Sequence, residues 1–326
     1  MRYMIILLDD AATSFCHYHN PKTVKRPMSH DDLKAGILFA MKQNLTVQLV
    51  YPSFDIPEPH RELIETTYHV KIMPANAAHA ASADVLVFNT LSEFSTMKIE
   101  DNPGKVFILR TNRQDLFNRD HPEHLTQNLV HHSGRLNIIL TDVDACTDAD
   151  FDAYREWLSV LCAQVAEACR SGKSPDVNIL HDRIAFEKMN NCNAGHESVT
   201  LAPNGKFYVC PAFYLDSEED STGAPQTGIE LKNQQLYRLE YAPLCRMCDA
   251  YHCKRCVWMN RKTTLEVNTP SRQQCVAAHL ERGASKNLLN ELKPEGYFSG
   301  ADIPSIDYLD PFDAVNQLIR QSKIKN

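Results

Sequence analysis

The chain has 326 residues, of which 43% are hydrophobic and 23% are charged, and its formal net charge at pH 7 is −7. This composition predicts an ordinary globular protein of about two domains, and the acidic balance argues against a general nucleic-acid binder. The first apolar run, residues 4–8, is too short for a signal peptide or a membrane span, and no later run is long enough. We expect a cytoplasmic protein without membrane segments, in which clustered cysteines serve metal or redox chemistry rather than disulfides.

Continuous apolar runs alternate with helical stretches through the first half of the chain. Such runs predict strands that are buried on both faces of a parallel sheet and joined by right-handed crossovers. The runs comprise residues 4–8, 47–51, 70–73, 85–88, 106–109 and 136–140. The pattern predicts an α/β fold, either a doubly wound sheet or a partial barrel, with functional groups at the carboxyl ends of the strands.

Two helices in this half have clear start signals. Ser29 precedes an apolar stripe that begins at Leu33, and Thr147 precedes a stripe that begins at Phe151. Both are good capping residues, and acidic residues in the following turn complement the helix dipole. The same acidic run superficially resembles a calcium loop, but it lacks the central glycine and the final glutamate of such a loop. It comprises Asp142, Asp144, Asp148, Asp150 and Asp152.

A long loop, residues 9–30, follows the first predicted strand. It contains Cys16, His17 and His19, which are residue types that ligate transition metals. A short grouping of this kind is weak as a motif, and an ordinary polar loop with a buried cysteine is the alternative. These three residues are therefore secondary candidates for metal ligation.

Seven of the eleven cysteines fall in one stretch of the second half. They are Cys192, Cys210, Cys245, Cys248, Cys253, Cys256 and Cys275. Between the first two of these, Asn204-Gly205 predicts a β-hairpin, because both residue types tolerate positive φ. The hairpin would return Cys210 to the neighbourhood of Cys192.

The spacing of the central four cysteines points to a shared inorganic centre. Two Cys-x2-Cys pairs separated by four residues place four thiols in a small volume, where thiolates would repel unless a cation or cluster neutralised them. Thiolates suit iron–sulfur clusters and zinc alike. The sequence thus leaves open iron–sulfur clusters, structural zinc, or thiols without metal.

In these cysteines the chain resembles a SPASM domain, the auxiliary-cluster domain of many radical SAM enzymes that modify peptides. The resemblance implies two [4Fe–4S] clusters, with zinc as the alternative metal. One would be held by Cys245, Cys248, Cys253 and Cys275. The other would be held by Cys192, Cys210 and Cys256, with no cysteine nearby for its fourth position.

The first half resembles a degenerate radical SAM barrel. The loop after the first strand has only Cys16 where such an enzyme carries three cysteines, so we expect no site for S-adenosylmethionine and no radical initiation. This combination resembles the CXXX repeat peptide maturase family. The implied fold is a parallel-sheet α/β domain over residues 1–172, a SPASM-like α+β domain over residues 173–283 and a helical extension over residues 284–326.

The resemblance implies an accessory maturase for a ribosomally made peptide rich in Cys-x-x-x repeats. Its partners would be that precursor peptide and a separate radical SAM enzyme. Whether the chain itself catalyses a reaction is open, and no catalytic residue is predicted. The alternatives are a zinc-stabilised scaffold that binds a peptide or protein, and a stand-alone iron–sulfur electron carrier.

Overall fold

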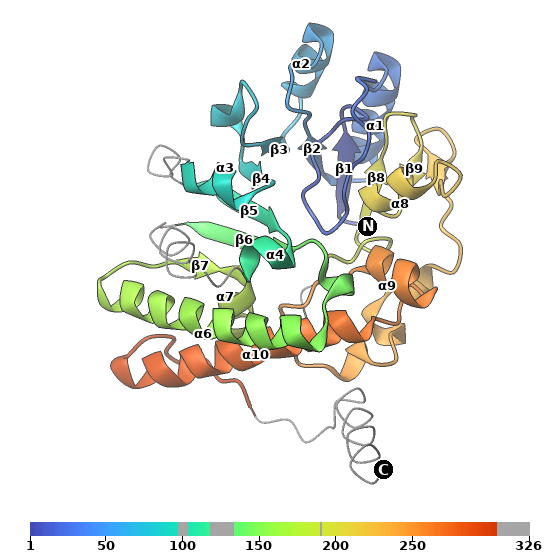
Figure 1. Cartoon of the computed structure of the whole chain (residues 1–326). Helices are drawn as coiled ribbons and strands as arrows, with labels where there is room; N and C mark the ends of the chain where they lie inside the picture. The colour runs from blue at the N-terminus through green and yellow to red at the C-terminus, as the bar shows by residue number, and fades with distance from the viewer. Residues whose placement is uncertain (97–103, 118–133, 190, 305–326) are drawn as a thin grey trace.

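The structure, a computed structural model, describes residues 1–96, 104–117, 134–189 and 191–304 (Figure 1). Its centre is a nine-stranded sheet in the order β7-β6-β5-β4-β3-β2-β1-β8-β9. The strands are β1 (Tyr3–Leu7), β2 (Thr46–Val50), β3 (His69–Pro74), β4 (Val85–Phe88), β5 (Val106–Thr111), β6 (Arg135–Leu140), β7 (Asp176–Val177), β8 (Ser198–Leu201) and β9 (Phe207–Tyr208). In the described ranges, no helix is both long and apolar enough to cross a membrane.

The first six strands lie side by side in chain order, and each pair of neighbours is parallel. β8 joins the free edge of β1 in parallel, and β9 is antiparallel to β8. All six predicted strands are confirmed, with ends that differ by at most two residues. The α/β fold is confirmed as well, and the uninterrupted order corresponds to a partial barrel rather than to a doubly wound sheet.

The two faces of the sheet belong to different apolar clusters. In β1, Met4 and Ile6 pack in the larger cluster with the helices, whereas Ile5 and Leu7 pack in the smaller cluster on the opposite face. The side chains alternate between the faces because successive strand residues point to opposite sides. We call the helix-covered side the outer face and the opposite side the inner face.

Helices that follow the strands cover the outer face. They are α1 (His30–Lys42), α2 (Glu58–Ile64), α3 (Leu91–Thr96), α4 (Arg113–Leu116), α6 (Asp148–Arg170) and α7 (Asn178–Ala185). A further helix, α10 (Arg272–Leu292), packs on α6 and α7. Both predicted caps are confirmed: the Ser29 hydroxyl accepts from the Asp32 N–H, and Thr147 forms a capping box with Asp150. α6 and α10 lie against each other (Figure 1).

The cysteine-rich half lies over the inner face and at the β1 edge. It contributes α8 (Pro211–Asp216), the hairpin of β10 (Gly223–Ala224) and β11 (Gly228–Ile229), and α9 (Val257–Thr264), with short 3₁₀ turns η4 (Gln234–Tyr237), η5 (Leu239–Tyr241) and η6 (Cys245–Met247). The predicted hairpin is present between β8 and β9, with Gly205 at φ +74°. A Cβ on Gly205 would come within 2.6 Å of Asp32 Oδ1, so this turn needs glycine for both reasons.

The sheet continues across the predicted domain boundary at residue 172, because β7, β8 and β9 belong to it. Helix α10 likewise continues across the predicted boundary at residue 283. Residues 305–326 of the predicted C-terminal extension lie outside the described residues. The division of the chain into three parts stays a prediction.

Candidate metal centre

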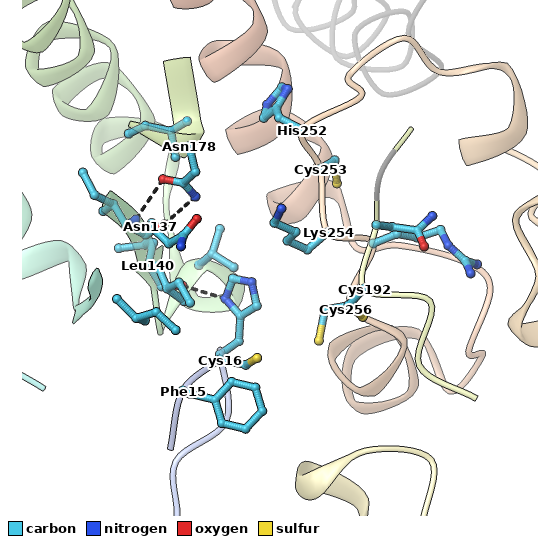
Figure 2. Close-up of a pocket in the computed structure, with 18 of the residues that line it drawn as sticks. Phe15, Cys16, Asn137, Leu140, Asn178, Cys192, His252, Cys253, Lys254 and Cys256 are labelled. Carbon is cyan, nitrogen blue, oxygen red and sulfur yellow. Dashed lines mark hydrogen bonds between the residues drawn. The ribbon is translucent and has the colours of Figure 1, made fainter. Parts of the chain in front are cut away.

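A cavity of about 520 Å³ lies between the inner face of the sheet and the cysteine-rich half (Figure 2). Strand side chains such as Ile72 and Ile108 form its floor. Residues 252–256 form the opposite wall together with α10, which contributes Glu281. The cavity is thus largely apolar on the sheet side and carries thiols and charges on the other.

A neighbouring cavity of about 250 Å³ brings together cysteines from four separate segments. Cys16, Cys192, Cys210 and Cys256 all line it. Figure 2 shows Cys16 on the loop after β1, with Cys192 and Cys256 on the segments across from it. Cys192, Cys210 and Cys256 belong to one predicted ligand set, whereas Cys16 was only a secondary candidate. The structure therefore places a residue of the first loop beside the predicted ligands of the second half.

Local structure fixes each of the three cysteines of the second half. The Cys192 N–H donates to the Lys254 carbonyl at 3.3 Å, which joins the start of the cysteine-rich half to its centre. Cys210 follows the β8–β9 hairpin and directly precedes α8. Cys256 directly precedes α9. Two helix starts and one backbone hydrogen bond therefore hold three residues, which are distant in the sequence, around one cavity.

The thiols in this cavity interact electrostatically. Burial raises the pKa of the Cys16, Cys210 and Cys256 thiols above the usual range, and negative charge on the neighbouring cysteines adds to that rise. These interactions join every pair among Cys16, Cys192, Cys210 and Cys256. Without a cation the buried thiols stay protonated, and binding of a metal centre would release their protons.

The remaining predicted ligands form a second group. Burial raises the pKa of Cys245 to about 11 and that of Cys253 to about 12, and both thiols also interact with Cys248. Cys248 Sγ lies 3.6 Å from His279 Nε2. His279 is one helical turn after Cys275 on α10, so α10 brings this last cysteine close to the group.

Arg255 stands beside this second group. Its side chain is 2% exposed, its backbone has φ +44°, and its Nε and Nη1 atoms are buried without a hydrogen-bond partner. Its Nη2 donates to the Tyr237 carbonyl, and its charge lowers the pKa of Cys245 against the larger effect of burial. A buried cation with unused donors fits an anionic neighbour.

The three residues of the first loop separate in space. Cys16 and His17 line both cavities, whereas His19 is exposed and lines neither. His17 Nδ1 lies 3.0 Å from the Leu140 carbonyl and must donate to it, which leaves Nε2 with its lone pair. Burial also lowers the pKa of the His17 imidazole, so the ring is neutral near pH 7.

The acidic run at the start of α6 has ordinary partners. Asp142 accepts from the Arg113 N–H, Asp150 completes the capping box, and Asp144 pairs with Lys262. Asp148 and Asp152 pair with Arg272 and Arg155. The helix-start interpretation of this run is confirmed.

Sequence reasoning missed two arginines that shape the site. Arg110 is 6% exposed, and it donates from Nε to the Cys16 carbonyl at 2.9 Å and from Nη2 to the Tyr18 carbonyl at 2.6 Å. Arg255 lies between Cys253 and Cys256 in the sequence and is not among the predicted site residues. For Arg110, the available signal was a lone arginine inside an otherwise apolar strand.

The four cysteines outside the predicted ligand sets lie in two different environments. Cys146, Cys162 and Cys169 are buried in the larger apolar cluster with α6, whereas Cys16 lines the cavities. All eleven cysteines are free of disulfides. Within the described ranges, no group of three or more His, Cys, Asp or Glu side chains is gathered tightly enough for a single metal ion.

No protein-family model and no curated protein matches the sequence. Solved structures of anSMEcpe, a radical SAM maturase with a SPASM domain, are similar to it. Native anSMEcpe with bound AdoMet matches with a TM-score of 0.60 and 11% identity, over 89% of this chain and 99% of that chain. Native anSMEcpe with bound AdoMet and Cp18Cys peptide matches with a TM-score of 0.57 and 11% identity, over 90% and 99% of the two chains.

The chain therefore has a radical SAM/SPASM-related fold over nine-tenths of its length. At 11% identity the likeness concerns the fold alone. Membership of the CXXX repeat peptide maturase family stays a prediction.

Proposed function

We propose that this protein is an accessory maturase that binds a Cys-rich precursor peptide, holds two [4Fe–4S] clusters and acts with a separate radical SAM enzyme in the cytoplasm. The observation that carries the proposal is that eight cysteines form two groups, of which the first lines the cavity of about 250 Å³ and the second reaches the larger cavity through Cys253. The first group is Cys16, Cys192, Cys210 and Cys256, and the second is Cys245, Cys248, Cys253 and Cys275.

The residues present fit iron–sulfur clusters. Four thiols around a cavity of about 250 Å³ surround a volume rather than a point, which suits a cluster better than a single ion. The second group has the orphaned Nε and Nη1 atoms of Arg255 beside it, which would hydrogen-bond to the sulfur atoms of an anionic cluster. Bound clusters would supply electron transfer, or an iron that coordinates a substrate thiol.

The cavity of about 520 Å³ is the proposed place for the peptide. Its floor is apolar, and its wall carries a few polar and charged groups, among them Lys254 and Glu281. Structures of anSMEcpe contain the peptides Cp18Cys and Kp18Cys, which supports a peptide as the ligand of this fold. The loop after β1 contributes one cysteine, Cys16, and His17 to the cavity. A radical SAM enzyme carries three cysteines in this loop, so its single cysteine supports the assignment of radical initiation to a partner enzyme.

Metal analysis tests the proposal directly. We expect about eight irons and eight sulfides per chain after anaerobic purification and reconstitution with ferrous iron and sulfide. Fewer than about four irons per chain would contradict the two-cluster proposal. A colourless protein with stoichiometric zinc would favour the peptide-binding scaffold instead.

Binding of a synthetic peptide with Cys-x-x-x repeats tests the partner. We expect binding to the reconstituted protein, and weaker binding of a matched peptide in which serine replaces each cysteine. Equal absence of binding for both peptides, together with reversible reduction of the clusters, would favour a stand-alone electron carrier.

A further inference from the structure

We propose that Cys16 is the fourth ligand of the cluster held by Cys192, Cys210 and Cys256, so that the loop after β1 completes a centre in the other half of the chain. This inference rests on the proposed iron–sulfur content and goes beyond it. The sequence gives the cysteine-rich half only three thiols for this cluster. The fold supplies the fourth from a residue far away in the chain.

The first argument is placement. Cys16 shares the cavity of about 250 Å³ with the other three cysteines, and no cysteine of the second group lines that cavity. Cys16 also interacts electrostatically with Cys192, Cys210 and Cys256, as a fourth corner would. A site with three thiols on one side and a single thiol on the facing segment has the donor set of a fully ligated [4Fe–4S] cluster.

The second argument is that Cys16 is held in place rather than carried on a loose loop. Arg110 on β5 donates from Nε to the Cys16 carbonyl at 2.9 Å and from Nη1 to Asn89 Oδ1 at 2.5 Å. His17, the next residue, is held by the Leu140 carbonyl at the end of β6. Asn20 Nδ2 donates to the Asp10 and Ala12 carbonyls, both at 2.8 Å, which closes the loop on itself. Two strands thus fix the position of one thiol, which is what a cluster ligand requires.

The third argument concerns charge. Arg110 is buried beside Cys16, and its Nε donates to the Cys16 carbonyl at 2.9 Å. Lys254, from the cysteine-rich half, lines the larger cavity that Cys16 also lines. Cationic groups on both sides of the thiol offset the negative charge that a ligated cluster carries.

This assignment has a functional consequence. A cluster with four cysteine ligands has no open iron, so a substrate thiol would not coordinate there. The cluster of Cys16, Cys192, Cys210 and Cys256 would then serve electron transfer or the joining of the two halves of the chain. Of the two roles proposed for the clusters, the geometry favours the first for this centre.

The test compares single variants after anaerobic reconstitution with ferrous iron and sulfide. In Cys16→Ala we expect conversion of one of two clusters to a three-iron form or its loss, read by iron content, Mössbauer and electron paramagnetic resonance spectroscopy. Cys16→Ser, which keeps an oxygen donor, should retain more iron than Cys16→Ala and show altered spectra. Cys146→Ala is the matched control, because Cys146 is buried outside both groups. It should keep the wild-type iron content.

Combined variants show whether Cys16 shares a cluster with Cys192. The double variant Cys16→Ala/Cys192→Ala should lose only as much iron as the more affected of the two single variants. Iron loss in Cys16→Ala with Cys253→Ala should be additive, because the two residues belong to different groups. An added small thiol such as 2-mercaptoethanol should restore the wild-type spectrum of Cys16→Ala by occupying the vacated position.

The outcomes are distinguishable. Wild-type protein without iron would overturn the proposed function itself. Wild-type protein with two clusters, and a correctly folded Cys16→Ala variant with the same spectra, would overturn only the assignment of Cys16. Cluster loss in His17→Ala but not in Cys16→Ala would also overturn it, in favour of the His17 imidazole. Circular dichroism on each variant checks that the comparison is made on folded protein.

Discussion

The two faces of the sheet are closed by different means. On the outer face, apolar side chains of the helices pack directly on the strands, as Phe94 does on Phe88. On the inner face, the cysteine-rich half leaves a cavity of about 520 Å³ and is tied to its surroundings in large part by charged groups. One of these ties is the pair of Lys254 and Asp182, at 3.4 Å. The comparison teaches that continuous apolar packing closes the outer face, whereas the inner face combines a smaller apolar cluster with a cavity lined by thiols and charged groups.

The strongest test of the outer face is the removal of an aromatic side chain from it. Phe88 is fully buried, with Phe94 edge-to-face at 5.1 Å between ring centroids. We expect Phe88→Ala to lower the free energy of unfolding by about 3–5 kcal/mol, because it leaves a cavity in the larger cluster. Urea unfolding followed by circular dichroism measures this change. A loss below about 1 kcal/mol would contradict the view that apolar packing dominates this face.

Asp249 joins the cysteine-rich half to two helices, because it pairs with Arg183 on α7 and Arg282 on α10. Its carboxylate accepts from Arg282 Nε at 2.7 Å and from Arg183 Nη2 at 3.0 Å, and both arginine side chains are largely buried. We expect Asp249→Asn to cost about 2–3 kcal/mol, because the two cations lose their charged acceptor.

Hydrogen exchange measured by mass spectrometry locates that effect. Exchange in Asp249→Asn should speed up in residues 245–256 and remain slow in β1 to β6. Uniform acceleration along the chain would show that the two faces do not differ as proposed. Conservative Asp249→Glu, which keeps the charge, is the matched control.

The cap of α6 offers a smaller perturbation on the outer face. Thr147 Oγ1 accepts from the Asp150 N–H at 3.3 Å, and Asp150 Oδ2 accepts from the Thr147 N–H at 2.7 Å. We expect Thr147→Ala to lower the free energy of unfolding by about 1 kcal/mol, through the loss of one side of the capping box. Thr147→Ser, which keeps the hydroxyl, should have a fraction of that effect in the same urea experiment.

Lys262 on α9 forms an ion pair with Asp144 that connects the two halves of the chain, with 2.9 Å between Nζ and Oδ2. We expect the smallest effect on stability from the loss of this pair. The lysine side chain is half exposed, so solvent screens the interaction. We expect Lys262→Ala to change stability by at most about 0.5 kcal/mol and to leave the iron content unchanged. A drop in iron content would instead place this pair among the groups that hold the cysteine-rich half over the sheet.

Much of the fold was predictable because its signals are local. Apolar runs identified all six early strands, and Asn204-Gly205 identified the hairpin that returns Cys210 toward Cys192. The choice between a partial barrel and a doubly wound sheet was not predictable, because periodicity does not show on which face a helix packs. Arg110 escaped notice because its role depends on the loop that folds across its strand.

The sequence by itself determined the strands, the caps and the hairpin. These features depend on neighbours in the chain, on side-chain periodicity and on backbone preferences that each residue carries with it. Only the tertiary structure decided that Cys16 faces Cys192, Cys210 and Cys256 while His19 faces solvent. The curvature of the sheet and the hydrogen bonds from β5 and β6 set that position, because a contact between distant segments depends on how the elements between them pack.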